Sequence, residues 1–126
     1  GTNEENMANI SSVFHNRLEN MYEYPHLQSD TTDNYIEDVI RPNIPSSSLA
    51  LYENVITAYD TYTCEGLPAG PICSPGLEAI NAALYPAETD YYYFLSSSDG
   101  VFYYASTVEK HEQNIIDAAL REEEQN

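Results

Sequence analysis

Apolar residues near the start of the chain recur at intervals of three and four, which is the spacing of one face of a helix. Between Asn6 and Glu19 these residues are Met7, Ile10, Val13, Phe14 and Leu18. The pattern predicts a helix whose apolar face meets a core. Thr2 or Asn3 is expected to cap its first turn, because short polar side chains accept hydrogen bonds from free backbone N–H groups. Arg17 falls in the last turn, where the helix dipole favours a cation, and a purely local role and a role in a binding groove both stay open.

The spacing of apolar residues gives a weaker indication of secondary structure in the middle of the chain. If Leu27–Thr31 is extended, Gln28 and Asp30 project to the same side, because side chains alternate along an extended backbone. Asp30 followed by two threonines is also typical of a helix cap or a turn, so both interpretations stay open. A short helix is expected from Tyr35 to Ile40, and 49–58 is either another short helix or an irregular approach to the next loop.

A loop rich in glycine and proline follows, at Tyr59–Gly76, with three residues of each kind. Glycine permits unusual backbone angles, whereas proline fixes φ and removes a hydrogen-bond donor. We therefore expect a rigid, shaped loop here. Both cysteines of the chain, Cys64 and Cys73, lie in it. Their spacing fits neither a zinc site nor a Cys-x-x-Cys redox pair, which leaves a disulfide that staples the loop or two free, buried thiols.

After this loop the apolar spacing predicts a helix that starts at Ser74 or Pro75 and ends at Leu84, before Pro86. Its residues Leu77, Ile80, Ala83 and Leu84 are expected to face a core.

The last part of the chain predicts a β-hairpin and a helix. Aromatic residues dominate Tyr91–Leu95, and Val101–Ala105 returns as its partner strand after a serine-rich turn. Val108–Arg121 is expected to form an amphipathic helix. The residues that it should turn inward are Ile115, Ile116, Ala119 and Leu120. The expected fold class is therefore α+β: helices packed on a small antiparallel sheet, with a C-terminal β-hairpin and helix.

Length and composition limit the number of domains and the possible partners. The 126 residues suit one domain, so we expect a single domain over 1–126. A formal net charge of −17 repels phosphate backbones and anionic membranes, which argues against nucleic acid as a partner. No apolar run is long enough to span a membrane, and the chain does not begin with a signal peptide pattern.

Several short motifs occur in an order that is typical of one family. They are Asn16-Arg17-Leu18, Leu27-Gln28-Ser29-Asp30, Asp60-Thr61-Tyr62, Gly66-Leu67-Pro68-Ala69-Gly70-Pro71-Ile72, Ser74-Pro75-Gly76, Ala82-Ala83-Leu84-Tyr85-Pro86, Asp90-Tyr91-Tyr92-Tyr93-Phe94 and Thr107-Val108-Glu109-Lys110-His111. From about Met7 to about Ile115 the chain resembles the YceG-like family of endolytic murein transglycosylases, and the resemblance implies the C-terminal part of that catalytic domain. The glycine- and proline-rich loop is the most specific element.

The resemblance also implies a reaction. A lytic transglycosylase cleaves glycan strands to 1,6-anhydro ends, and one Glu donates a proton to the leaving oxygen and then takes one from the 6-hydroxyl of the substrate. In the family this Glu precedes the segment that matches Met7–Leu18, so we expect it upstream of this chain. We therefore assign no catalytic residue here, neither Glu4 nor Glu5, because a solvated terminus does not raise a carboxyl pKa much.

The residues that the resemblance places along a glycan groove form one set. They are Gln28, Asp30, Asp60, Tyr62, Gly66, Gly70 and Ile72. Asp60 stands where the family has Asn, which changes the local hydrogen-bond pattern. His111 is expected to pack or cap. His15 and His26 have no second ligand at metal spacing, so no metal site is expected.

No cofactor is expected either. Relatives have also been labelled aminodeoxychorismate lyase, but pyridoxal phosphate needs a Schiff-base lysine and a phosphate cradle. The sole lysine, Lys110, lies on a predicted surface helix of a strongly acidic chain.

Two functions follow from the resemblance. The first is a piece of a peptidoglycan lytic transglycosylase that acts outside the cytoplasmic membrane, is anchored through a segment not present here, and works near the cell-wall synthesis machinery. The second is a non-catalytic peptidoglycan-binding or scaffold module of the cell envelope.

Overall fold

The computed structural model describes residues 2–125. The chain divides into two compact units. The terminal unit comprises the residues up to Asn16 together with those from Pro75 onward, and the central unit is Arg17–Ser74. The single domain expected from the length remains a prediction.

The first helix, α1, is Asn3–Glu19 and begins three residues before the predicted start. Thr2 and Glu5 cap it reciprocally: the Glu5 N–H donates to Thr2 Oγ1 at 3.2 Å, and the Thr2 N–H donates to the Glu5 carboxylate at 2.9 Å. Val13 is buried and the other predicted core positions of this helix are half-buried. The predicted helix and the Thr2 cap are confirmed.

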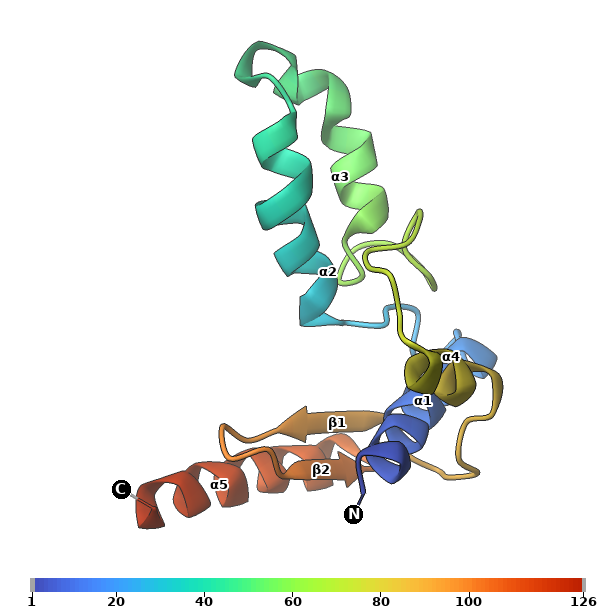
Figure 1. The fold of residues 1–126 in the computed structure, drawn as a ribbon, viewed down its shortest axis with the longest axis vertical. Helices are drawn as coiled ribbons and strands as arrows, with labels where there is room; N and C mark the ends of the chain where they lie inside the picture. Colours follow the sequence, from blue (N-terminus) through green and yellow to red (C-terminus); the bar gives the residue numbers. More distant parts are fainter. Residues whose placement is uncertain (1, 126) are drawn as a thin grey trace. The chain divides into compact units, whose positions relative to one another are not determined.

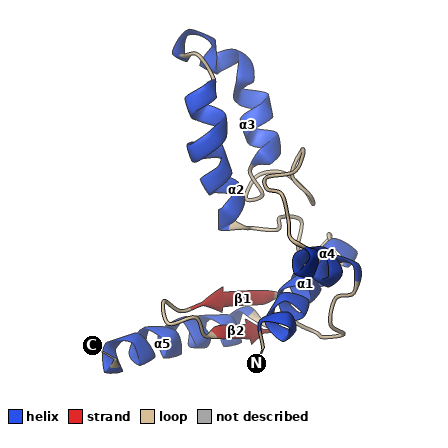
Figure 2. Ribbon diagram, in the orientation of Figure 1, coloured by secondary structure: helices blue, strands red, loops and turns tan. Residues whose placement is uncertain are grey.

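The terminal unit is built on a two-stranded antiparallel hairpin of β1 (Tyr93–Ser96) and β2 (Phe102–Ala105), with Tyr93 opposite Ala105. Helix α5 (Val108–Glu124) lies along both strands (Figures 1 and 2). Its start is capped by Thr107, whose Oγ1 accepts a hydrogen bond from the Lys110 N–H at 3.2 Å. The predicted α+β class, hairpin and final helix are confirmed.

The rotation of α5 differs from the prediction. Asn114 and Ala118 are buried toward the hairpin, and His111 stacks on Tyr93 with ring centroids 5.1 Å apart. Ile115, Ile116, Ala119 and Leu120, which were predicted to face inward, are exposed. The Asn114 side chain donates to the Tyr104 carbonyl at 3.1 Å, so its buried amide has a partner on the side of the helix that meets the sheet. The packing role expected for His111 is confirmed.

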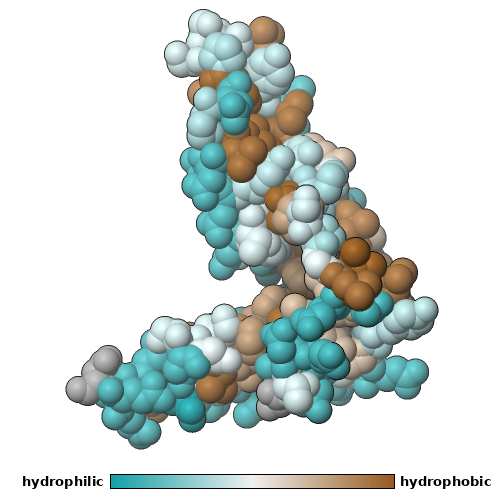
Figure 3. Space-filling model, in the orientation of Figure 1, coloured by the Kyte–Doolittle hydropathy of each residue, from teal (hydrophilic) through white to brown (hydrophobic). Residues whose placement is uncertain are grey.

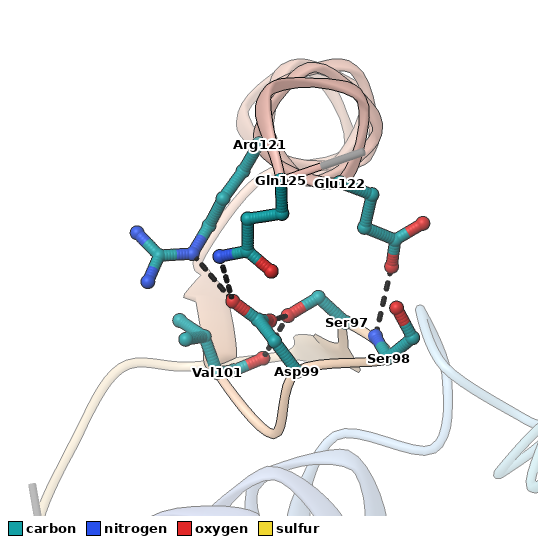
Figure 4. Close-up of polar contacts among 7 residues, drawn as sticks. All are labelled: Ser97, Ser98, Asp99, Val101, Arg121, Glu122 and Gln125. Carbon is teal, nitrogen blue, oxygen red and sulfur yellow. Dashed lines mark hydrogen bonds and ion pairs between the residues drawn. The ribbon is translucent and has the colours of Figure 1, made fainter.

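Asp99 joins the hairpin turn to the end of α5. Its carboxylate accepts hydrogen bonds from Arg121 Nε at 2.7 Å and Gln125 Nε2 at 2.9 Å, and the Ser97 hydroxyl also donates to it (Figure 4). These donors, the Ser97 hydroxyl first, hold the pKa of Asp99 well below its usual range. Arg121, the cation in the last helical turn of α5, is therefore paired with the loop between the two strands.

Helix α4 (Leu77–Leu84) follows Gly76, slightly later than predicted. The predicted core stripe of Leu77, Ile80, Ala83 and Leu84 is exposed, and hydrophobic side chains gather on the surface over this helix (Figure 3). Ala79 and Ala82 are the half-buried positions. The prediction of an inward Leu stripe is therefore wrong. The small side chains face the unit instead, and the His15 ring bonds the Ala83 carbonyl at 2.8 Å.

The central unit is mostly helical. Helix α2 (Asp30–Tyr35) continues into the π-helix η1 (Ile36–Ile40) and the 3₁₀ turn η2 (Arg41–Asn43). The chain returns through the 3₁₀ helix η3 (Ser46–Tyr52) and α3 (Glu53–Tyr59), which lies beside the first arm (Figure 1). Tyr35 stacks on Tyr59 with ring centroids 5.6 Å apart. The short helix at 35–40 and the helical alternative for 49–58 are confirmed.

Residues 60–76 form neither helix nor strand apart from one bridge, as predicted for a loop. Within residues 2–125, no helix is long and apolar enough to cross a membrane.

Candidate functional site

Two buried hydroxyl groups, those of Thr32 and Thr61, link the start of α2 to the segment that follows α3. Thr61 Oγ1 accepts a hydrogen bond from the Ser29 N–H at 2.9 Å and lies 2.8 Å from the Thr32 hydroxyl. Thr32 in turn donates to the Ser29 carbonyl at 2.8 Å. Thr61 is only 1% exposed and Thr32 is also buried. This hydroxyl network therefore fixes two segments about thirty residues apart in the chain against each other.

Two of the predicted groove residues, Asp30 and Tyr62, are in direct contact with each other next to this hydroxyl network. The Tyr62 hydroxyl donates to the Asp30 carboxylate, and the Tyr62 N–H donates to Asp60 Oδ1 at 2.9 Å. The hydrogen bond to Asp30, followed by burial, raises the pKa of Tyr62 to about 12. At neutral pH the hydroxyl keeps its proton. Its oxygen can still accept a hydrogen bond, and Tyr62 as a whole is 42% exposed.

Asp33 adds a third carboxyl group. Burial, and then the neighbouring Asp60 carboxylate, raise the pKa of Asp33. We call Asp30, Asp33, Asp60 and Tyr62 the acidic patch. Carboxylates accept hydrogen bonds from vicinal hydroxyl groups, and an exposed aromatic ring offers a face for stacking. Asp33 was not among the predicted residues, although it lies one helical turn after Asp30.

Gln28 does not share a strand face with Asp30. Its φ is +54°, and its N–H donates to the Thr61 carbonyl at 3.1 Å. Ser29 is the N-cap position of α2, and Asp30 is already helical. The prediction of an extended Leu27–Thr31 is therefore wrong, and the alternative of a helix start is correct. The backbone of Gln28 is tied to the same network, while its side chain is exposed.

Gly66 and Gly70, the two loop glycines that were predicted to approach a glycan, are required by close packing within this unit. Gly66 is buried at φ +69°, and its N–H donates to the Pro25 carbonyl at 3.0 Å. A Cβ at Gly66 would come 3.3 Å from Met21 Cε, and one at Gly70 would come 2.6 Å from the Tyr59 hydroxyl. Ile72 is half-buried, with no hydrogen bond to the acidic patch among residues 2–125. Their contact with a glycan remains a prediction.

Arg17 supports this loop from the end of α1. Its guanidinium is buried, donates from Nη1 to the His26 carbonyl at 2.8 Å, and lies over the Tyr24 ring at 5.2 Å. His26 bridges to Gly66, and its Nδ1 lies 2.9 Å from the Cys64 carbonyl. The sequence left the role of Arg17 open between helix and groove. The structure places it as a link between the helix and the loop.

Cys64 and Cys73 are both free thiols, so the predicted disulfide is not present in the structure. The Cys64 thiol is directed to the Leu67 carbonyl, 3.9 Å away, within its own turn. Cys64 is half-buried and Cys73 is exposed, so the alternative of two buried thiols fits only the first. Burial raises the pKa of Cys64.

Thiol labelling is expected to separate the two cysteines. Two thiols should react with Ellman's reagent without prior reduction, and Cys73 should react several-fold faster than Cys64, because the thiolate is the reactive form and burial disfavours it. The Cys64→Ser and Cys73→Ser variants assign the phases. If thiols become reactive only after reduction, the disulfide forms after all.

A cavity of about 240 Å³ lies in the terminal unit. Its lining residues are Glu4, Ala8, Glu78, Asn81, Ala82 and Tyr85. None of the predicted groove residues is among them. No group of three or more potential metal ligands lies together in the part of the chain that the structure describes.

Comparison with known proteins gives consistent matches. A family model described as the YceG-like family matches residues 1–117. An endolytic murein transglycosylase of Bacillus subtilis strain 168 is 34% identical over 110 residues, which are 87% of this chain and 29% of that protein. An endolytic murein transglycosylase of Streptococcus pneumoniae serotype 2 strain D39 is 32% identical over 119 residues, or 93% of this chain and 21% of that protein.

A crystal structure of a YceG-like protein from Listeria monocytogenes also matches, with a TM-score of 0.66 and 36% identity. The match covers 84% of this chain and 33% of that chain. The chain thus spans less than a third of the length of the curated relatives named above.

Proposed function

This chain belongs to the YceG-like family, and from that premise we propose that it is part of a peptidoglycan lytic transglycosylase and forms one wall of the glycan-binding groove. The observation that carries the proposal is the acidic patch, where Asp30 and Asp60 both bond Tyr62. Three carboxyl groups and an exposed ring suit a neutral, hydroxyl-rich ligand better than an anionic one. The strongly negative charge of the chain agrees with this choice.

In this proposal the wall binds and orients a sugar while a Glu outside this chain moves the proton. That Glu protonates the leaving oxygen as the glycosidic bond breaks, and it then takes the proton of the 6-hydroxyl as the C1–O6 bond forms. No water is consumed and no cofactor is needed. The Tyr62 hydroxyl, whose proton is committed to Asp30, would accept a hydrogen bond from the sugar, and its ring would stack on the sugar's C–H face.

The location follows from the substrate. We place the parent protein at the extracytoplasmic face of the cell membrane, held by a segment outside this chain, and near the cell-wall synthesis machinery. The proposed wall is completed by backbone or rim contacts of four further residues, Gln28, Gly66, Gly70 and Ile72.

Replacing Tyr62 by alanine is expected to weaken binding of the chain to insoluble peptidoglycan about tenfold, because a stacked ring contributes on the order of 1 kcal/mol or more beyond its buried area. A pelleting assay with purified sacculi measures this. Tyr52→Ala is the matched control, since Tyr52 is 44% exposed in the same unit and lies in η3. Equal binding of the Tyr62→Ala variant and the parent would remove the acidic patch from the proposal.

The catalytic part is tested on the parent protein extended toward its N-terminus. Digestion of peptidoglycan should release anhydro-ended strands, and mass spectrometry detects them. A folded, full-length protein that binds sacculi but releases no such ends would show that the module is a non-catalytic binder.

A further inference from the structure

The outer face of α5 carries apolar side chains that the fold of the terminal unit does not use. Val108, Ile115, Ile116 and Leu120 are each between 44 and 53% exposed. The side that meets the hairpin is filled instead by Asn114 and Ala118. An amphipathic helix ordinarily turns its branched aliphatic residues to the core. Their opposite placement leaves these four apolar side chains about half exposed, as far as residues 2–125 show.

Acidic residues lie among these apolar residues on the same face of the helix. Glu109, Glu112 and Glu123 recur on the same side of the helix as Ile116, at intervals of three, four or seven residues. All three are exposed, and none of their carboxylates has a hydrogen-bond or ion-pair partner among residues 2–125.

The two cations of the helix lie elsewhere. Lys110 and Arg121 are about three turns apart and share the side of the helix away from Glu112. Arg121 is already paired with Asp99 at 2.7 Å (Figure 4). The outer face therefore presents branched apolar side chains and uncompensated negative charge together.

We propose that the outer face of α5, defined by Val108, Glu109, Glu112, Ile115, Ile116, Leu120 and Glu123, is a docking surface for a protein segment that folds as an amphipathic helix with its apolar stripe bordered by Lys or Arg. Charge complementarity selects this partner. A second copy of the chain would bring the same three glutamates against themselves, in molecules of net charge −17. An anionic membrane surface is repelled for the same reason.

The probe is a synthetic peptide of about five helical turns, with a leucine stripe bordered by lysine and a fluorophore at one end. A second peptide has the same stripe bordered by glutamate. Fluorescence anisotropy with the 126-residue chain should detect binding of the lysine peptide and not of the glutamate peptide. Equal binding of both peptides overturns the proposal, because it would show unspecific apolar contact.

Variants then distinguish binding by this face from attraction to the net negative charge of the whole protein. Ile115→Ser combined with Ile116→Ser is expected to weaken binding about tenfold or more, since most of the apolar contact is lost. Leu51→Ser is the matched control, because Leu51 is 81% exposed in the central unit. Glu112→Gln should weaken binding several-fold, whereas Glu53→Gln, an exposed acid of α3, should not. Circular dichroism confirms that each variant is folded.

Three results would overturn the proposal. The first is unchanged binding by the double serine variant, which would mean that the peptide follows net charge alone. The second is a dimer in sedimentation that this variant dissolves, which would make a second copy the occupant. The third is binding of the chain to anionic vesicles that is lost in the same variant.

Discussion

Replacing Thr61 by valine is expected to destabilise the central unit by about 2 kcal/mol, because buried polar groups left without a partner cost about 1–3 kcal/mol. Valine keeps the shape of threonine but removes the hydroxyl. The Ser29 N–H then loses the acceptor that it now reaches at 2.9 Å, and the Thr32 hydroxyl loses its neighbour at 2.8 Å. No water can easily replace them, since Thr61 is almost completely buried.

Urea denaturation followed by circular dichroism measures the loss, and the chain has no tryptophan to serve as a fluorescence probe. Thr57→Val is the matched control, because the exposed Thr57 hydroxyl bonds only the Glu53 carbonyl of its own helix, at 3.0 Å. Its effect should stay below about 0.5 kcal/mol. If the two variants lose the same stability, the hydroxyl network does not hold the central unit together.

The same variant connects stability to the acidic patch. Thr61 lies between Asp60 and Tyr62 in the chain and is bonded to the residue before Asp30. Loosening it should separate Tyr62 from Asp30, and the pKa of Tyr62 should then fall from about 12 toward its usual value. A spectroscopic titration of the tyrosines reads this shift independently of the denaturation curve.

Elements with a strong local signal were predictable from the sequence. The three- and four-residue spacing from Met7 to Leu18 gave the first helix, and the aromatic run that leads into β1 gave the hairpin. Both patterns depend on the geometry of one element alone. The loop at 60–76 was equally predictable, since glycine and proline restrict the backbone locally.

The faces of α4 and α5 were not predictable, because tertiary contacts decide them. In α5, the side that meets the hairpin carries Asn114, which bonds the Tyr104 carbonyl, together with Ala118 and His111. In α4, alanines rather than leucines face the unit. A hydropathy pattern shows that a helix has an apolar and a polar side. It does not show which of the two sides packs against a small sheet lined with aromatic residues.

The candidate site was predictable in part. The resemblance placed Asp30, Asp60 and Tyr62 along one groove, and the structure brings these three together. The extended alternative for Leu27–Thr31 has a side-chain period of two, whereas α2 has a period of 3.6, and for this reason Asp33 was missed. Thr61 was missed because a lone threonine in a loop carries no signal until its burial is known.

Replacing Arg17 by methionine is expected to destabilise the chain by about 2–3 kcal/mol, because hydrogen bonds of charged groups contribute about 1.5–3 kcal/mol and the contact with the Tyr24 ring adds to this. Methionine retains most of the apolar stem, so the loss reports on the guanidinium. The His26 carbonyl loses a donor at 2.8 Å, and His26 carries the bridge to Gly66.

Arg41→Met is the control, since the exposed pair of Arg41 with Glu37 at 2.8 Å spans one helical turn and should contribute less than about 0.5 kcal/mol. Urea denaturation compares the two variants, and faster proteolysis within 60–76 should accompany only the first. An Arg17→Met variant as stable as Arg41→Met would mean that the loop is fixed by its own glycines and prolines. The end of α1 would then be a neighbour of the loop and not its support.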